Sequence, residues 1–197
     1  MTLIRLAELI TAGIETNSVR QQNEDRLVKE CLKGNRKAHS ELYALYKDKM
    51  YGVCLRYASS EAEASDMLQE GFIKVFEGLH QFKQNSPLFY WIKRVVINAA
   101  LGQIRKNKNR TEREEPLDDN VSEVRIEPED TEGTDELLWM IQKLPTEYRT
   151  VFNLYTIEGY AHKEIAEMLH ISEANSKVRL MRGRQILQQQ LKKQMIA

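Results

Sequence analysis

Basic side chains concentrate at two places along this chain, and both have the chemistry that binds phosphate. The first is the run 105–110, which reads Arg-Lys-Asn-Lys-Asn-Arg. The second lies beyond residue 170, where four cations recur at close spacing: Lys177, Arg179, Arg182 and Arg184. Lysine and arginine neutralise phosphates, and they supply much of the affinity that proteins have for nucleic acid. These two segments therefore predict contacts with a polyanion.

Catalytic or metal-binding chemistry has no comparable pattern. The chain has 4 histidines, and no two of them have an H-x-x-x-H spacing that would hold a metal ion: His39, His80, His162 and His170. Cys31 and Cys54 are too few and too far apart for a disulfide framework or a zinc site, so we expect them to pack in a core. No glycine-rich phosphate loop or nucleophile elbow occurs. We expect no enzyme activity, no cofactor and no metal.

The second basic segment lies in a pattern typical of a helix-turn-helix. Pro145 can begin a helix without losing a needed N–H, and that helix would stop near Gly159. A short helix over 163–169 is followed by the turn 170–172, in which Ser172 is the expected N-cap of a final helix. Two helices joined by a turn of three or four residues, the second one basic, can place a recognition helix in a major groove.

The first basic segment ends a series of helices. Apolar residues recur at helical spacing over 38–57, then over 68–79, and again over 91–105. The stretch 80–88 separates the last two helices with polar residues and a proline, which indicates a loop. The fold class predicted is all-α.

A strongly acidic stretch divides the chain into two small helical domains. Residues 111–136 hold 12 acidic side chains against 2 basic ones, and they show no apolar period. We expect a flexible linker there, or a segment that mimics nucleic acid in a partner's basic channel. The predicted domains are then 23–110 and 137–197, and 1–22 is an N-terminal extension of unknown role.

Composition limits where the protein acts. The longest run without a charged residue is Val95–Ile104, half of the roughly 20 residues that a membrane-spanning helix needs. Near the start, Arg5, Glu8 and Glu15 interrupt any apolar signal core. We expect no membrane insertion and a cytoplasmic location.

Two groups of motifs resemble a known family. The stretches 49–57, 66–76 (Asp-Met-Leu-Gln-Glu-Gly-Phe-Ile-Lys-Val-Phe) and 91–98 are similar to region 2 of the extracytoplasmic-function sigma factors of the sigma-70 family. The stretches 158–169 and 171–177 look like region 4 of the same family. The residues of these motifs resemble those of family members from Bacteroidetes-type bacteria.

The resemblance implies a protein that binds core RNA polymerase and directs it to promoter DNA, with an anti-sigma factor as a further family expectation. The residues implied in docking on the clamp coiled coil of the polymerase are Asp66, Gln69 and Glu70. Those implied at the −10 element are Phe82, Lys83, Gln84, Asn85, Ser86, Lys93, Arg94, Asn98 and Arg105. Those implied at the −35 element are Asn175, Ser176, Lys177, Arg179, Arg182 and Arg184.

The sequence departs from the family at three positions in region 4. Ala161 replaces the usual Ser or Thr N-cap, His170 replaces a turn glycine, and Gly183 replaces an alanine inside the last helix. These departures predict a marginally stable domain.

The alternative function is a stand-alone helix-turn-helix regulator, which would explain residues 137–197 but leave the first domain without a role.

Overall fold

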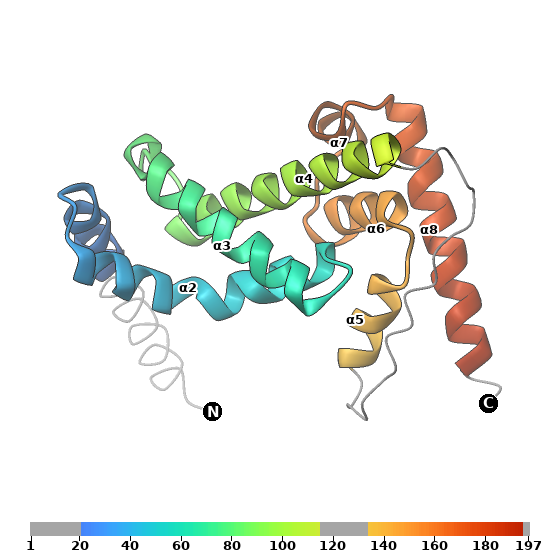
Figure 1. Ribbon diagram of the computed structural model, residues 1–197, viewed down its shortest axis with the longest axis horizontal. Coiled ribbons are helices and arrows are strands. Elements are labelled where there is room, and N and C mark those ends of the chain that lie inside the picture. The colour runs from blue at the N-terminus through green and yellow to red at the C-terminus, as the bar shows by residue number, and fades with distance from the viewer. Residues whose placement is uncertain (1–20, 115–133, 195–197) are drawn as a thin grey trace, which may run out of the picture.

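All regular structure in the described part of the chain is helical, which confirms the predicted fold class. A computed structural model describes residues 21–114 and 134–194, with side chains for 21–107 and 136–193. After helical residues 21–32, the elements follow in this order (Figure 1): α2 Arg36–Tyr57, α3 Glu61–Gly78, the 3-10 turn η1 Leu79–Gln81, α4 Leu88–Glu114, α5 Thr134–Gln142, α6 Thr146–Phe152, the π turn η2 Asn153–Ile157, α7 His162–Leu169 and α8 Glu173–Gln194.

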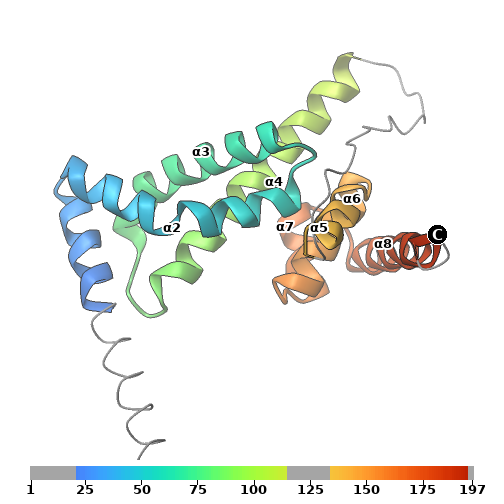
Figure 2. The same ribbon diagram turned by 90° about the horizontal axis from the view of Figure 1, so that it is seen from below.

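Helices α2, α3 and α4 pack along one another and bury a core of aliphatic and aromatic side chains. The largest of these side chains include Leu42, Tyr46, Met67 and Ile92, all fully buried. Figure 2 shows α4 crossing behind α2 and α3, and α8 nearly end-on at the far side. This apolar interior is what fixes the outward faces of α3 and α4.

Helix α3 approaches α4 closely because Gly71 has no side chain. A Cβ built at Gly71 would lie 3.1 Å from Cγ2 and 3.4 Å from Cα of Val96, tighter than side chains usually pack. Val96 is itself fully buried on α4. The contact sets a short separation between the two helices.

Side-chain caps determine where these helices begin. The Asn35 side chain accepts hydrogen bonds from the backbone N–H groups of Lys37 and Ala38, so α2 starts at Arg36. Ser60 accepts from the backbone N–H of Glu63 and starts α3. Such caps satisfy donors that have no partner within the helix.

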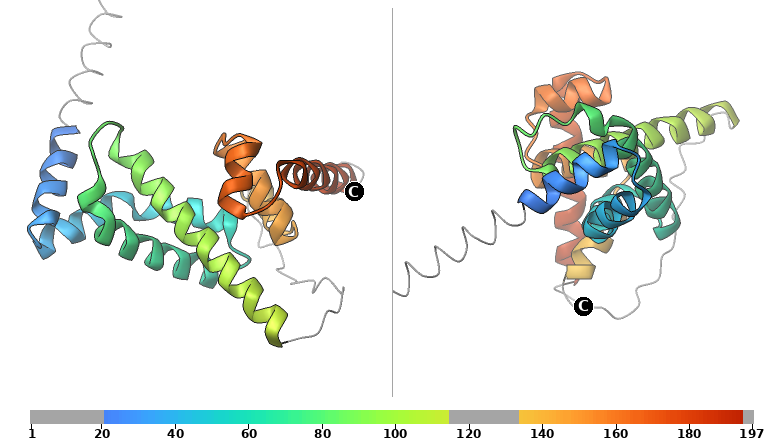
Figure 3. Two further views of the ribbon diagram at one scale, coloured as in Figure 1. Left: turned by 90° about the horizontal axis from the view of Figure 1, so that it is seen from above. Right: turned by 90° about the vertical axis from the view of Figure 1, so that its left-hand side faces the viewer.

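The C-terminal half forms the predicted helix-turn-helix from α7 and α8, supported by α5 and α6 (Figure 3). Ser172 is the N-cap as expected, because its hydroxyl accepts from the backbone N–H of Asn175 at 3.1 Å. His170 has φ 54° and ψ 45°, the left-handed conformation that the sequence predicted for this turn.

Some residues expected to pack in the interior are exposed. Leu45 lies in the apolar pattern of α2 and is 39% exposed. Val178 and Met181, apolar residues of α8, are 42% and 52% exposed. The last helix instead buries Leu180 and Leu187, one face of its 3.6-residue period, and that choice leaves the two others outside.

The two halves pack against each other. Val151, Leu154, Ile165 and Leu180 of the second half belong to the same cluster of buried residues as the core of the first half. Figure 1 shows α5 and α6 beside the end of α2, with α8 running across the end of the molecule opposite residues 21–32. In the described residues, the two helical units are thus packed against each other.

The segment between the two units begins and ends at helices. Helix α4 continues to Glu114, past the predicted domain end at residue 110, and α5 begins at Thr134, before the predicted start at 137. The rest of the predicted acidic linker, 115–133, lies outside the described residues, as does 1–20 of the N-terminal extension.

Both cysteines pack in the interior, as predicted. Cys31 is 4% exposed and Cys54 is fully buried, and burial raises the pKa of the Cys54 thiol to about 12. Within the described ranges, no helix combines the length and the apolar character required to cross a membrane.

Candidate nucleic-acid interface

One face of α3 is polar and exposed, opposite the face that packs in the core. Asp66 and Gln69 are exposed, and Glu70 is partly buried and pairs with Lys74 at 3.2 Å. Met67 and Leu68, between them in sequence, are buried. The three predicted polymerase-docking residues therefore lie together on one helical surface.

The loop between η1 and α4 presents most of the residues predicted to capture a base. Lys83, Gln84, Asn85 and Ser86 are exposed. Gln84 has φ 56°, a left-handed conformation that a side chain other than glycine seldom adopts. Phe82 is instead partly buried, with its ring 5.5 Å from the ring of Trp91. The loop thus offers exposed hydrogen-bonding groups above an aromatic pair.

Three of the four predicted DNA contacts on α4 are exposed. Arg94, Asn98 and Arg105 are exposed, and Arg105 also donates to the backbone carbonyl of Met168 at 3.2 Å. Lys93 is partly covered: its ammonium lies 5.9 Å from the ring centre of Phe89 and 5.8 Å from that of Tyr90. Stacking of this kind holds the ammonium in place.

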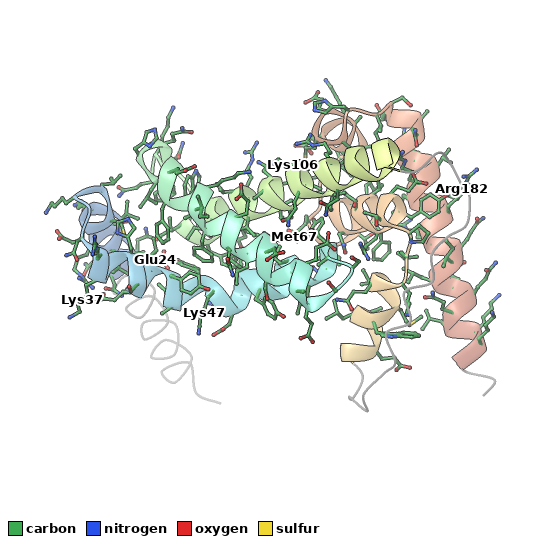
Figure 4. All side chains as sticks on the ribbon, viewed as in Figure 1. Glu24, Lys37, Lys47, Met67, Lys106 and Arg182 are labelled. Atoms are coloured by element: carbon green, nitrogen blue, oxygen red, sulfur yellow. The ribbon has the colours of Figure 1, made fainter. Side chains whose placement is uncertain are left out.

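The recognition helix α8 carries its predicted cations in several states. Asn175, Lys177, Arg182 and Arg184 are exposed; Arg182 is labelled on α8 in Figure 4. Lys177 pairs with Glu173 at 2.7 Å, and Arg182 donates to the Tyr148 hydroxyl at 3.2 Å. Arg179 is held by Glu147 at 3.1 Å, with 19% of its side chain exposed.

Ser176 differs from the other predicted −35 residues because it is fully buried. Its hydroxyl hydrogen-bonds Nδ1 of His162 at 2.9 Å, and the His162 ring stacks on Tyr155 with ring centres 4.4 Å apart. Ser176 therefore joins α7 to α8 inside the helix-turn-helix, and its side chain does not reach the surface in this arrangement.

A set of polar contacts that the sequence did not indicate joins the two units. The Gln142 side chain donates to the backbone carbonyl of Leu55 at 2.9 Å, and the Asn153 side chain donates to that of Arg56. The carboxylate of Glu158 pairs with Arg56 at 2.8 Å and with Lys93 at 2.6 Å. Arg56 and Glu158 lie 102 positions apart, so no local spacing could have revealed the pair.

Clusters of metal ligands are absent from the part of the chain that the structure describes: no three His, Cys, Asp or Glu side chains come together there. The arrangement brings together exposed cations, a polar helix face and a helix-turn-helix. These are features of a protein that binds nucleic acid and a protein partner.

Comparison with known proteins identifies that class. Residues 42–110 match the family model of Sigma-70 region 2, and residues 134–187 match that of Sigma-70 region 4. The extracytoplasmic-function RNA polymerase sigma factor SigW of Bacillus subtilis is 33% identical over 181 residues, which cover 84% of this chain and 95% of that relative. The RNA polymerase sigma-H factor of Pseudomonas aeruginosa is 27% identical, covering 87% and 95%.

A solved structure has the same fold. The sigma factor RpoE of Bartonella quintana, crystallised with the anti-sigma factor NepR, matches with a TM-score of 0.53 and 19% identity, covering 78% of this chain and 96% of that one.

The chain belongs to the extracytoplasmic-function sigma factors of the sigma-70 family. It is a non-enzymatic subunit that binds core RNA polymerase and promoter DNA and directs transcription initiation, with its DNA-binding helix-turn-helix in region 4. The resemblance seen in the sequence is confirmed at the level of the family, and the alternative of a stand-alone regulator is not supported.

Proposed function

We propose that this sigma factor docks on core RNA polymerase through the polar face of α3, using Asp66, Gln69 and Glu70. The observation that carries the proposal is the two-sidedness of α3: Asp66 and Gln69 are exposed, whereas Met67 and Leu68 are buried. A solvated carboxylate and amide at the surface of a rigid helix can pair with cationic and polar groups of a partner. In this assignment 23–110 is region 2, 111–136 the linker and 137–197 region 4.

The −10 element is assigned to the loop 82–86 and to α4. The exposed loop side chains can hydrogen-bond an unstacked base, and Phe82 with Trp91 supplies an apolar surface beneath it. Arg94, Asn98 and Arg105 can hold the backbone of the strand, together with Lys93 once Glu158 releases it.

The −35 element is assigned to α8. Asn175, Lys177 and Arg179 lie in its first turns, where a recognition helix reaches base edges, and Arg182 and Arg184 can hold phosphates. Ser176 is assigned a positioning role through its hydrogen bond to His162.

Three further assignments extend the family relationship. An anti-sigma factor regulates this protein, as NepR is found with RpoE of Bartonella quintana. The protein acts in the cytoplasm, where its polymerase is. The source is a Bacteroidetes-type bacterium, because the residues of the motifs over 66–76 and 158–177 resemble those of family members from such bacteria.

Co-elution with purified core RNA polymerase tests the docking face. The variant Asp66→Ala/Glu70→Ala should lose binding, since each lost charge-assisted contact weakens association by roughly tenfold or more. The matched control is Asp48→Ala/Glu61→Ala, which removes the same charge at two other exposed helical positions. Loss of binding in the first variant alone supports the proposal; equal binding by both variants rejects the α3 face as the docking site.

A further inference from the structure

Three charged side chains meet where region 4 packs on region 2. Arg56 comes from the last turn of α2, Lys93 from the first half of α4, and Glu158 from the residue that follows η2. The Glu158 side chain is 2% exposed, while those of Arg56 and Lys93 are 23% and 24% exposed. The carboxylate of region 4 is thus enclosed by two cations of region 2.

The pairing is divided between the two carboxylate oxygens. Oε1 of Glu158 lies 2.8 Å from Nη2 of Arg56, and Oε2 lies 2.6 Å from Nζ of Lys93. A phosphate group of nucleic acid also presents two charged oxygens on one atom, and arginine and lysine are the side chains that bind it. Two cations on a rigid helical bundle therefore form a site that suits either anion.

The two cations are held ready by region 2 itself. A second Arg56 nitrogen, Nη1, donates to the backbone carbonyl of Gly52 at 3.1 Å. Lys93 lies near the rings of Phe89 and Tyr90. These contacts lie within region 2 and do not depend on Glu158, so departure of region 4 would leave the site assembled.

Lys93 adjoins the surface that meets the −10 strand in the proposed function. Arg94 follows it directly, and Asn98 lies further along the same helix, with both side chains exposed. A phosphate bound by Arg56 and Lys93 would extend that surface toward the end of α2.

We propose that Arg56 and Lys93 form a phosphate-binding site for promoter DNA, which Glu158 occupies when region 4 is docked on region 2. Arg56 is a DNA-contacting residue in this assignment. Glu158 acts as an intramolecular competitor, so the free protein binds DNA weakly until region 4 moves. The inference rests on the proposed placement of the −10 strand along α4.

Binding of the full chain to a fluorescein-labelled oligothymidylate of about 20 nucleotides tests the site, because this probe reports backbone phosphate contacts. Glu158→Gln leaves both cations facing a neutral amide, which disfavours the docked arrangement. The variant should bind the probe about tenfold tighter at low salt. The slope of log K against log salt concentration should steepen by about 1.4, because each of the two new phosphate contacts with single-stranded nucleic acid contributes about 0.7.

Two variants separate this effect from a general change of charge. Glu167→Gln removes the same charge from an exposed position on α7 and should bind the probe like the unmodified protein. Adding Arg56→Gln and Lys93→Gln to Glu158→Gln should abolish the gain in affinity and in salt slope. A gain that persists in this triple variant, or an equal gain in Glu167→Gln, would overturn the proposed site.

Energy transfer between dyes follows the docking directly. Ile73→Cys on α3 and Leu191→Cys on α8 provide exposed positions, 53% and 47% exposed, and both native cysteines are buried. Energy transfer should fall in Glu158→Gln because region 4 moves away from region 2. An unchanged helical circular dichroism signal would show that this fall is not caused by loss of fold. Unchanged transfer together with unchanged probe affinity would reject the competitor role.

Core polymerase binding by Glu158→Gln is measured in the same preparation, and it should be at least as strong as that of the unmodified protein. Failure of the probe experiment with normal core binding would discard the competitor alone and leave the α3 docking face standing.

Discussion

Like Gln84, His170 adopts a backbone conformation that a side chain disfavours. Its backbone is left-handed, with φ 54°, at the end of α7. A side chain with a Cβ is crowded in this conformation, whereas glycine adopts it freely. The turn of the helix-turn-helix therefore carries strain that a glycine would relieve.

We expect His170→Gly to stabilise the protein by about 1 kcal/mol, the lower end of the cost of a left-handed residue. The measurement is the free energy of unfolding from chemical denaturation. As a control, His39→Gly places glycine inside α2 and removes the ring that packs on Phe76, and the two losses together should destabilise the protein by about 1 kcal/mol. A loss of stability in both variants would mean that the His170 side chain makes contacts worth more than the strain.

Residue-level features were the part of the structure that the sequence predicted best. The Ser172 cap and the left-handed His170 follow from residue types at fixed positions in a turn, and the structure contains both. Ala161 likewise begins α7 without a side-chain cap of its own, although Glu164 accepts a hydrogen bond from its backbone N–H at 2.8 Å.

At the scale of the element, a histidine joins the two helices of the helix-turn-helix. His162 of α7 bonds the buried Ser176 of α8 and stacks on Tyr155. Burial lowers the pKa of His162, and the nearby positive charge of Lys177 lowers it further. The folded domain therefore favours the uncharged ring.

Acidification should consequently weaken region 4. The unfolded chain binds a proton on His162 near its ordinary pKa of about 6.5, before the folded state does, so stability is lost as the pH falls through that value. We expect the melting temperature to drop between about pH 7.5 and about pH 5.5, and to drop less in His162→Gln. An identical drop in the variant would assign the pH dependence to other groups.

Apolar periodicity predicted the helices but not which of their apolar residues are buried. Leu45, Val178 and Met181 are apolar residues at helical spacing that remain exposed. A period states which residues share a face, and the packing partner decides which of two adjacent apolar faces is covered. That partner is set by tertiary structure, which spacing along one helix does not contain.

At the scale of the whole molecule, the two regions share one buried cluster and several polar contacts. Fully buried Asn153 is central among them, because its amide donates to the Arg56 carbonyl at the end of α2. None of these long-range pairs could be predicted from the sequence, since the partners are distant in the chain and common in type.

The shared interface should make the two regions unfold together. Asn153→Ala removes the donor to the Arg56 carbonyl, at a cost of about 1–3 kcal/mol for a buried group left unsatisfied. Differential scanning calorimetry should then show the single transition of the unmodified protein separate into two. Asn175→Ala changes an exposed asparagine of region 4 and should leave one transition; a single transition in both variants would mean that the apolar contacts alone couple the regions.

The close approach of Gly71 to Val96 has a mechanical consequence. Because the backbone of α3 meets the side chain of α4 without an intervening side chain, the two helices cannot slide or separate without disrupting a buried valine. The surface of Asp66 and that of Arg94 thus keep a constant spacing. On the proposed assignments, the polymerase holds α3 and the promoter strand meets α4. The fixed distance between these two helices then determines the position along the promoter at which the strands open.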